Sequence, residues 1–96
     1  MMKDGTGEVV RHLEIVNEKG LHARASAKFV ETVERFDASA TVSREGLSAS
    51  GDSIMGLLML VAARGSVIEV RTTGAQAEAL ANALEDLVAA RFGEEM

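Results

Sequence analysis

The chain has 96 residues, enough for one small domain, with a net charge of −5, no cysteine, no Trp and no Tyr. The lack of cysteine excludes disulfides, thiolate catalysis and thiolate-bound metals, and the acidic charge without aromatic platforms argues against nucleic acid and anionic membranes as partners. No apolar signal core precedes the domain and no apolar run is long enough to span a bilayer, so we expect a cytoplasmic protein.

The apolar pattern predicts seven elements in the order β-α-β-β-α-β-α. Alternating apolar residues indicate strands, and spacings of three and four residues indicate amphipathic helices. Strands this short need partners and the helices need a surface to cover, so we expect an α+β fold: one four-stranded antiparallel sheet with all three helices on one face. The expected strands are residues 9–16, 38–44, 47–50 and 67–72, and the expected helices are residues 23–36, 54–63 and 75–92.

A single domain is expected over residues 9–92, with a flexible N-terminal tail at 1–8 and a polar C-terminal tail at 93–96. Within it, the apolar stripes of the first and last helices predict core positions. His12 alternates with apolar strand neighbours and is expected to face solvent without a role. The predicted helical core residues are Ser26, Phe29, Val30, Val33, Ala77, Leu80, Ala81, Leu84, Leu87 and Val88.

The most informative stretch is Gly20-Leu21-His22-Ala23-Arg24, which predicts a loop ending in a histidine at the start of a helix. The free backbone N–H groups of a helix N-terminus and its partial positive charge suit a phosphate. Neutral imidazole is a nucleophile near pH 7, and an arginine can pair with phosphoryl oxygens. His22 could therefore carry a phosphoryl group beside Arg24, although a plain loop histidine would fit the same short motif.

Three segments of the chain resemble, in order and spacing, the HPr family of phosphocarrier proteins, and the resemblance covers about residues 13–88. The matching segments are NEKGLHAR at residues 17–24, DSIMGLLML at 52–60 and GSVIEV at 65–70, with Thr73-Gly74 before the last helix. The resemblance implies an open-faced β-sandwich, in agreement with the sheet and helices expected above. It also implies a bacterial carrier, without metal or bound cofactor, that is not itself an enzyme.

By this resemblance, His22 accepts a phosphoryl group on Nδ1 from the phosphoenolpyruvate-dependent Enzyme I and passes it to an Enzyme II-A domain. Arg24 matches the family arginine that neutralises the phosphate. Proline usually follows that arginine, and here Ala25 does. Alanine keeps the helix and loosens its entry, so we expect function to survive, which a comparison of phosphorylation rates with Ala25→Pro would test.

Ser53 precedes the apolar run of the second helix and is expected to be its N-cap. Most serines at such a position do nothing else. The resemblance adds that this position is modified by HPr kinase/phosphorylase in many bacteria, which makes Ser53 a candidate regulatory site. Phosphate on an N-cap serine is compatible with the helix dipole, and Asp52 beside it could alter recognition by the kinase.

The second helix carries apolar residues on nearly every face. Leu57 and Leu60 would suffice for the core, which leaves a surface for Enzyme I and Enzyme II-A, unless the helix is more deeply buried than its length suggests. We expect this docking surface to contain Ala23, Ala27, Ile54, Met55 and Leu58.

Two branches of the family remain open, a sugar-uptake HPr with regulation at Ser53 and the nitrogen-related paralogue called NPr. The runs 57–60 and 68–70 favour the nitrogen-related branch. A different class, a small-ligand-binding regulatory α/β module without phosphotransfer, leaves His22 and Arg24 unexplained. Two histidines without clustered carboxylates provide no hydrolytic triad or metal cage, and the expected state is a monomer.

Overall fold

The computed structural model describes residues 7–96, so all but the last two residues of the predicted N-terminal tail lie outside the described part. The elements follow the predicted order. They are β1 (Val9–Glu14), α1 (Ala23–Glu34), β2 (Ser39–Arg44), β3 (Leu47–Ser50), α2 (Ile54–Leu58), β4 (Val67–Thr73), α3 (Ala77–Ala89) and a final 3₁₀ turn, η1 (Arg91–Gly93).

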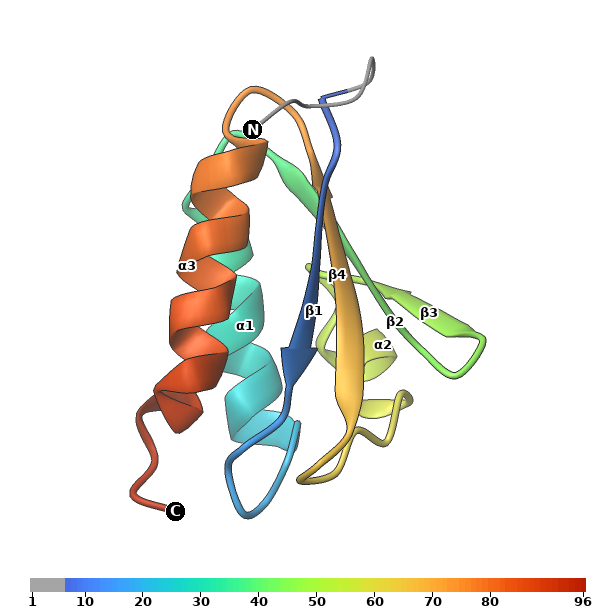
Figure 1. Cartoon of the computed structure of the whole chain (residues 1–96), viewed down its shortest axis with the longest axis vertical. Coiled ribbons are helices and arrows are strands. Elements are labelled where there is room, and N and C mark those ends of the chain that lie inside the picture. The colour runs from blue at the N-terminus through green and yellow to red at the C-terminus, as the bar shows by residue number, and fades with distance from the viewer. Residues whose placement is uncertain (1–6) are drawn as a thin grey trace.

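The four strands form one antiparallel sheet in the order β1-β4-β2-β3 (Figure 1). Strand β4 is central, because it pairs on one side with β1, where Leu13 faces Ile68, and on the other with β2, where Val42 faces Val70. Successive side chains of a strand point to opposite faces of the sheet. Accordingly Leu13, Ile68 and Val70 are buried, whereas His12 and Glu14 are exposed.

Helices α1 and α3 lie side by side against the buried face, and α2 packs against α1 and β3 (Figure 1). This confirms the α+β fold expected from the alternating strands. The predicted helical core residues are buried except Leu87, which is partly buried against the same core. None of the helices in residues 7–96 is both long enough and apolar enough to cross a membrane.

The second predicted helix is too long, because α2 ends at Leu58 rather than near residue 63. The N–H groups of Leu60 and Val61 bond to carbonyls three residues back, and Val61 has a left-handed φ of 50°. These tight turns bury Leu60 and Ala62 and bring the carbonyl of Ala62 to the N–H of Leu21, 2.9 Å away. An apolar run does not distinguish such a buried turn from a helix.

The last predicted helix is also wrong at its C-terminal end, because α3 stops at Ala89 and the chain turns sharply. Arg91 and Phe92 both take left-handed φ values, 57° and 55°. The turn places the Phe92 ring in the core, where it is fully buried. Burial of an aromatic ring contributes about 1.5–3 kcal/mol. This is comparable to the backbone strain of two left-handed residues, at about 1–2 kcal/mol each.

Candidate functional site

His22 is the N-cap residue of α1, as the sequence predicts. Its backbone is extended, with φ −79° and ψ −176°, and its carbonyl accepts the N–H of Ser26 at 2.8 Å. Its side chain makes no capping hydrogen bond. The imidazole is therefore not used to close the helix, and the N–H groups of Ala23, Arg24 and Ala25 have no intrahelical acceptor.

The loop before His22 is held by close backbone contacts. Gly20 has φ 67°, and a Cβ added there would lie 2.5 Å from the carbonyl oxygen of Ala62. Asn17, which is fully buried, donates from Nδ2 to the Gly20 carbonyl at 2.8 Å. A side chain at position 20 would force these segments apart, so glycine is needed to place His22 at the helix entrance.

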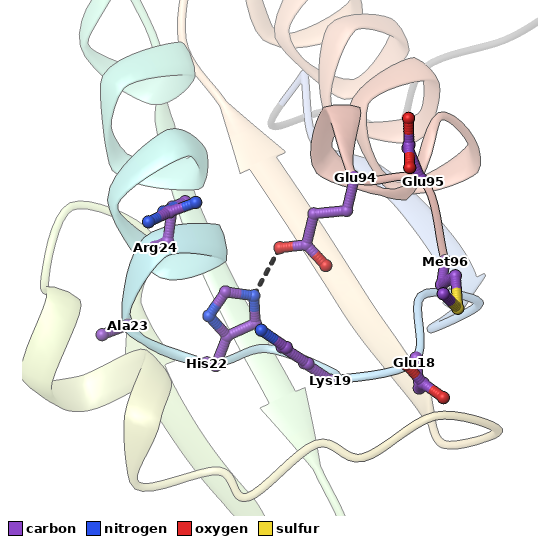
Figure 2. A pocket seen from close by; sticks show the side chains of 8 residues that line it. All are labelled: Glu18, Lys19, His22, Ala23, Arg24, Glu94, Glu95 and Met96. Carbon is purple, nitrogen blue, oxygen red and sulfur yellow. Dashed lines mark hydrogen bonds and ion pairs between the residues drawn. The ribbon is translucent and has the colours of Figure 1, made fainter.

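Glu94, from the C-terminal end of the chain, contacts the imidazole directly. Its Oε2 bonds His22 Nε2 (Figure 2). Its Oε1 accepts a hydrogen bond from Asn17 Nδ2 at 3.0 Å. Because Asn17 Nδ2 faces two acceptor oxygens, the orientation of that amide follows from its partners. Neither Glu94 nor Asn17 was predicted as a site residue. The last four residues were expected to form a polar tail, and Asn17 was noted only as part of the matching segment at 17–24.

The electrostatics of Glu94 result from opposing effects. Burial alone would raise the pKa of the Glu94 carboxyl. The hydrogen bonds from Asn17 and His22, and the electrostatic attraction of His22 and Lys19, outweigh it and hold the pKa below its ordinary value of 4.5. Glu94 is therefore a carboxylate near neutral pH, and it can only accept hydrogen bonds.

Arg24 is exposed in the first turn of α1 and makes no hydrogen bond or ion pair with another residue in 7–96. Arg24 and His22 line one open pocket, which Figure 2 shows between the start of α1 and the end of the chain. A cation without a protein partner beside a helix N-terminus can pair with an incoming anion. The other lining residues are Glu18, Lys19, Ala23, Glu94, Glu95 and Met96.

The second histidine lies elsewhere. His12 is on the exposed face of β1, with its Nε2 3.4 Å from Glu69 on the neighbouring strand. Its side chain is 66% exposed and does not line the pocket at His22. The structure therefore agrees with the prediction of a solvent-facing strand residue.

Comparisons with known proteins identify the family. A family model described as "PTS HPr component phosphorylation site" matches residues 9–90. The phosphocarrier protein HPr of Neisseria meningitidis serogroup A is 48% identical over 82 residues, which cover 85% of this chain and 92% of that protein. The chain belongs to the HPr family. It is a histidine-phosphorylated carrier that relays a phosphoryl group from Enzyme I to an Enzyme II-A protein, rather than an enzyme.

The HPr fold is matched by a crystal structure of HPr-C-His from Thermoanaerobacter tengcongensis, with a TM-score of 0.87 and 35% identity. The match covers 92% of this chain and 99% of that one. A phosphocarrier protein NPr from Shewanella violacea is 39% identical over 84 residues, covering 88% of this chain and 92% of the relative.

The candidate site of regulatory phosphorylation lies at the start of α2. Ser53 is the N-cap, and its Oγ accepts the N–H of Gly56 at 3.0 Å, as the capping pattern predicts. Asp52 accepts the hydroxyl of Ser50 at 2.5 Å. The hydroxyl of Ser53 keeps its proton available while its oxygen caps the helix.

The predicted docking residues differ in exposure. Ala23, Ile54 and Met55 are exposed, and Ala27 and Leu58 are partly buried, whereas Leu57 and Leu60 are in the core. Met59 and Val61 are also exposed, although neither was predicted as a docking residue. Both lie just beyond the end of α2, which the apolar run places further along the chain.

Proposed function

We propose that His22 is the residue that carries the phosphoryl group between Enzyme I and Enzyme II-A in the cytoplasm. The observation that supports it most is the position of His22 at the N-cap of α1, with its imidazole free of capping and three unpaired N–H groups following it. Arg24 is exposed and has no hydrogen bond or ion pair within residues 7–96, which supports a role in neutralising the incoming charge.

In the proposed transfer, the lone pair of Nδ1 forms a bond to phosphorus while the bond from phosphorus to the donor breaks. The bonding electron pair leaves with the donor, and the reverse occurs when the acceptor attacks. Such transfers depend on positioning and charge neutralisation more than on covalent chemistry by the protein. The exposed site suits this role, because each partner must reach phosphorus from outside.

The test is to incubate the chain with phosphoenolpyruvate and Enzyme I and to map the modified residue by mass spectrometry under conditions that preserve phosphohistidine. We expect one phosphoryl group, on the peptide that contains His22. A modification found on His12 instead would refute this assignment.

The proposed docking surface combines residues of α1 and α2, some exposed and some partly buried: Ala23, Ala27, Ile54, Met55 and Leu58. Met55 is 70% exposed and Ile54 40% exposed. Because α2 packs against α1, whose N-terminus bears His22, this surface adjoins the phosphoryl site. A partner seated on it would approach the imidazole, which fits a monomeric carrier that binds its two partners in turn.

Membership of the nitrogen-related branch is the finer part of the proposal, and it rests on the runs at 57–60 and 68–70. The comparisons do not single out this branch, because the Neisseria relative at 48% is named HPr and the Shewanella relative at 39% is named NPr. Competition between a nitrogen-related and a sugar-specific Enzyme II-A for the phosphorylated chain tests it. Faster transfer to the sugar-specific acceptor would overturn the choice.

Regulation at Ser53 belongs to the alternative, a sugar-uptake HPr. The N-cap geometry supports it, because phosphate there would face the positive end of α2 and place charge beside the docking surface. Incubation with HPr kinase/phosphorylase and ATP should then give phosphoserine at Ser53. Absence of phosphoserine would end this alternative.

A further inference from the structure

We propose that Glu94 is a positioning residue for phosphoryl transfer, which holds the His22 ring by Nε2–H and leaves Nδ1 as the nucleophile. This inference rests on the proposed role of His22 as the phosphoryl acceptor. It assigns a function to the C-terminal end of the chain, which the sequence presents only as a polar tail.

The carboxylate of Glu94 is fixed from two directions. One oxygen bonds His22 Nε2, and the other accepts Asn17 Nδ2 at 3.0 Å. Asn17 is itself fully buried and tied to the Gly20 carbonyl, in the same loop that carries His22. The Glu94 side chain is 18% exposed and that of His22 28%. The ring is thus oriented by a carboxylate that the loop itself holds in place.

The C-terminal turn delivers this carboxylate. Phe92 is fully buried in the core, and its carbonyl accepts Lys28 Nζ from α1 at 2.6 Å. Two successive left-handed residues, Arg91 and Phe92, redirect the chain after α3. Glu94 follows two residues after this anchor, so its reach to His22 is set by core packing and not by a free chain end.

The chemistry follows from what a carboxylate can accept. The lowered pKa of Glu94 keeps it ionised, so the ring nitrogen that faces it must carry the proton. In the neutral ring the lone pair is then on Nδ1, which lies on the side of the ring away from Glu94 (Figure 2). When Nδ1 bonds phosphorus and the donor leaves, Nε2 keeps its proton and the ring becomes positive. Glu94 pairs with that positive charge.

The experiment compares Glu94→Ala and Glu94→Gln with the wild type, using Enzyme I and phosphoenolpyruvate. Glu34→Gln is the matched control, since Glu34 is exposed at the far end of α1. Two quantities are measured: the rate of His22 phosphorylation, and the ¹⁵N shifts of the neutral imidazole, which report the protonated nitrogen without any phosphoryl transfer.

We expect Glu94→Ala to slow phosphorylation about tenfold, the lower end of the loss seen when a metal-bound histidine loses the carboxylate that orients it. We also expect it to reduce the share of the Nε2–H form. Glu94→Gln should be no faster than Glu94→Ala. Asn17 Nδ2 would donate to the amide oxygen of the new glutamine. The glutamine N–H₂ group would then face the ring nitrogen Nε2 and favour a proton on Nδ1. A purely space-filling role predicts the opposite order, because glutamine restores the shape.

Wild-type rates and unchanged ¹⁵N shifts in both variants would overturn the proposal. Faster phosphorylation of Glu94→Ala would also overturn it, because it would show that Glu94 hinders access to the His22 ring. A failure of the proposed function is separable. Wild type that is not phosphorylated on His22 refutes the carrier role, while the ¹⁵N shifts still report whether Glu94 sets the protonated nitrogen.

Discussion

At His22, the backbone caps the helix and the side chain is left free for chemistry. His22 caps α1 with its backbone carbonyl alone, which leaves its side chain for chemistry. Arg24, two residues later, is exposed and not committed to an ion pair within residues 7–96. In the proposed relay, the backbone therefore supplies the anion site, and the two side chains act on the anion.

Replacement of Arg24 tests this division. Since Arg24 is exposed and makes no hydrogen bond or ion pair within the described part of the chain, Arg24→Ala should leave the melting temperature nearly unchanged. It should slow phosphorylation of His22 by about tenfold to a hundredfold, the loss expected for one charge-assisted contact of about 1.5–3 kcal/mol. Calorimetry and the phosphorylation rate are the measurements. A large drop in melting temperature with an unchanged rate would make Arg24 structural.

The pH dependence of stability tests the contacts of Glu94. The pKa of Glu94 is lowered in the folded chain, by Asn17 and His22 above all. The ionised carboxylate therefore stabilises the fold fully at pH values above 4.5, the ordinary pKa of the group. That contribution is lost as the pH falls through the folded pKa. The melting temperature of wild type should exceed that of Glu94→Gln at pH 6, and the difference should close below pH 4.5. A difference that is constant over this range would contradict the assigned contacts.

At the scale of elements, the strands could be predicted and the helix ends could not. Alternation placed β3 at Leu47–Ser50 without error, because its bounds follow from turns on either side. The C-terminal limits of α2 and α3 depend instead on distant packing. Leu60 and Ala62 turn beneath the loop of His22, and Phe92 turns into the core. Both segments keep an apolar pattern while leaving the helix, so local spacing cannot reveal the change.

The short α2 has a functional consequence that a charge on its surface should expose. Met55 is 70% exposed, so Met55→Glu should change the free energy of unfolding by less than about 0.5 kcal/mol. If α2 contacts Enzyme I, the same change should weaken binding about tenfold, or about 1.4 kcal/mol. Isothermal titration with Enzyme I and thermal unfolding are the measurements.

A control for that substitution lies on β1. Val10 is exposed on the face of the sheet away from the helices, and Val10→Glu adds the same charge to another apolar surface residue. It should leave Enzyme I binding unchanged. Equal weakening by both variants would show a general charge effect and would remove the evidence for a docking surface on α2.

At the scale of the molecule, the fold could be predicted because each strand and helix carries its own apolar period, and one antiparallel sheet satisfies all of them. The position of His22 and Arg24 at the start of α1 could be predicted because both belong to one short motif. The contact of Glu94 with His22 joins residues 72 positions apart, and no local pattern indicates it. The fold closes the site by bringing its last turn back to the start of its first helix (Figures 1 and 2).

The most direct test of the account follows a labelled phosphoryl group through the whole relay, from phosphoenolpyruvate and Enzyme I to an Enzyme II-A acceptor. Wild type and His12→Ala should both take up the label and pass it on, because His12 lies away from the site. His22→Ala should keep its fold by NMR and transfer none. Label reaching the acceptor through folded His22→Ala would contradict the central claim.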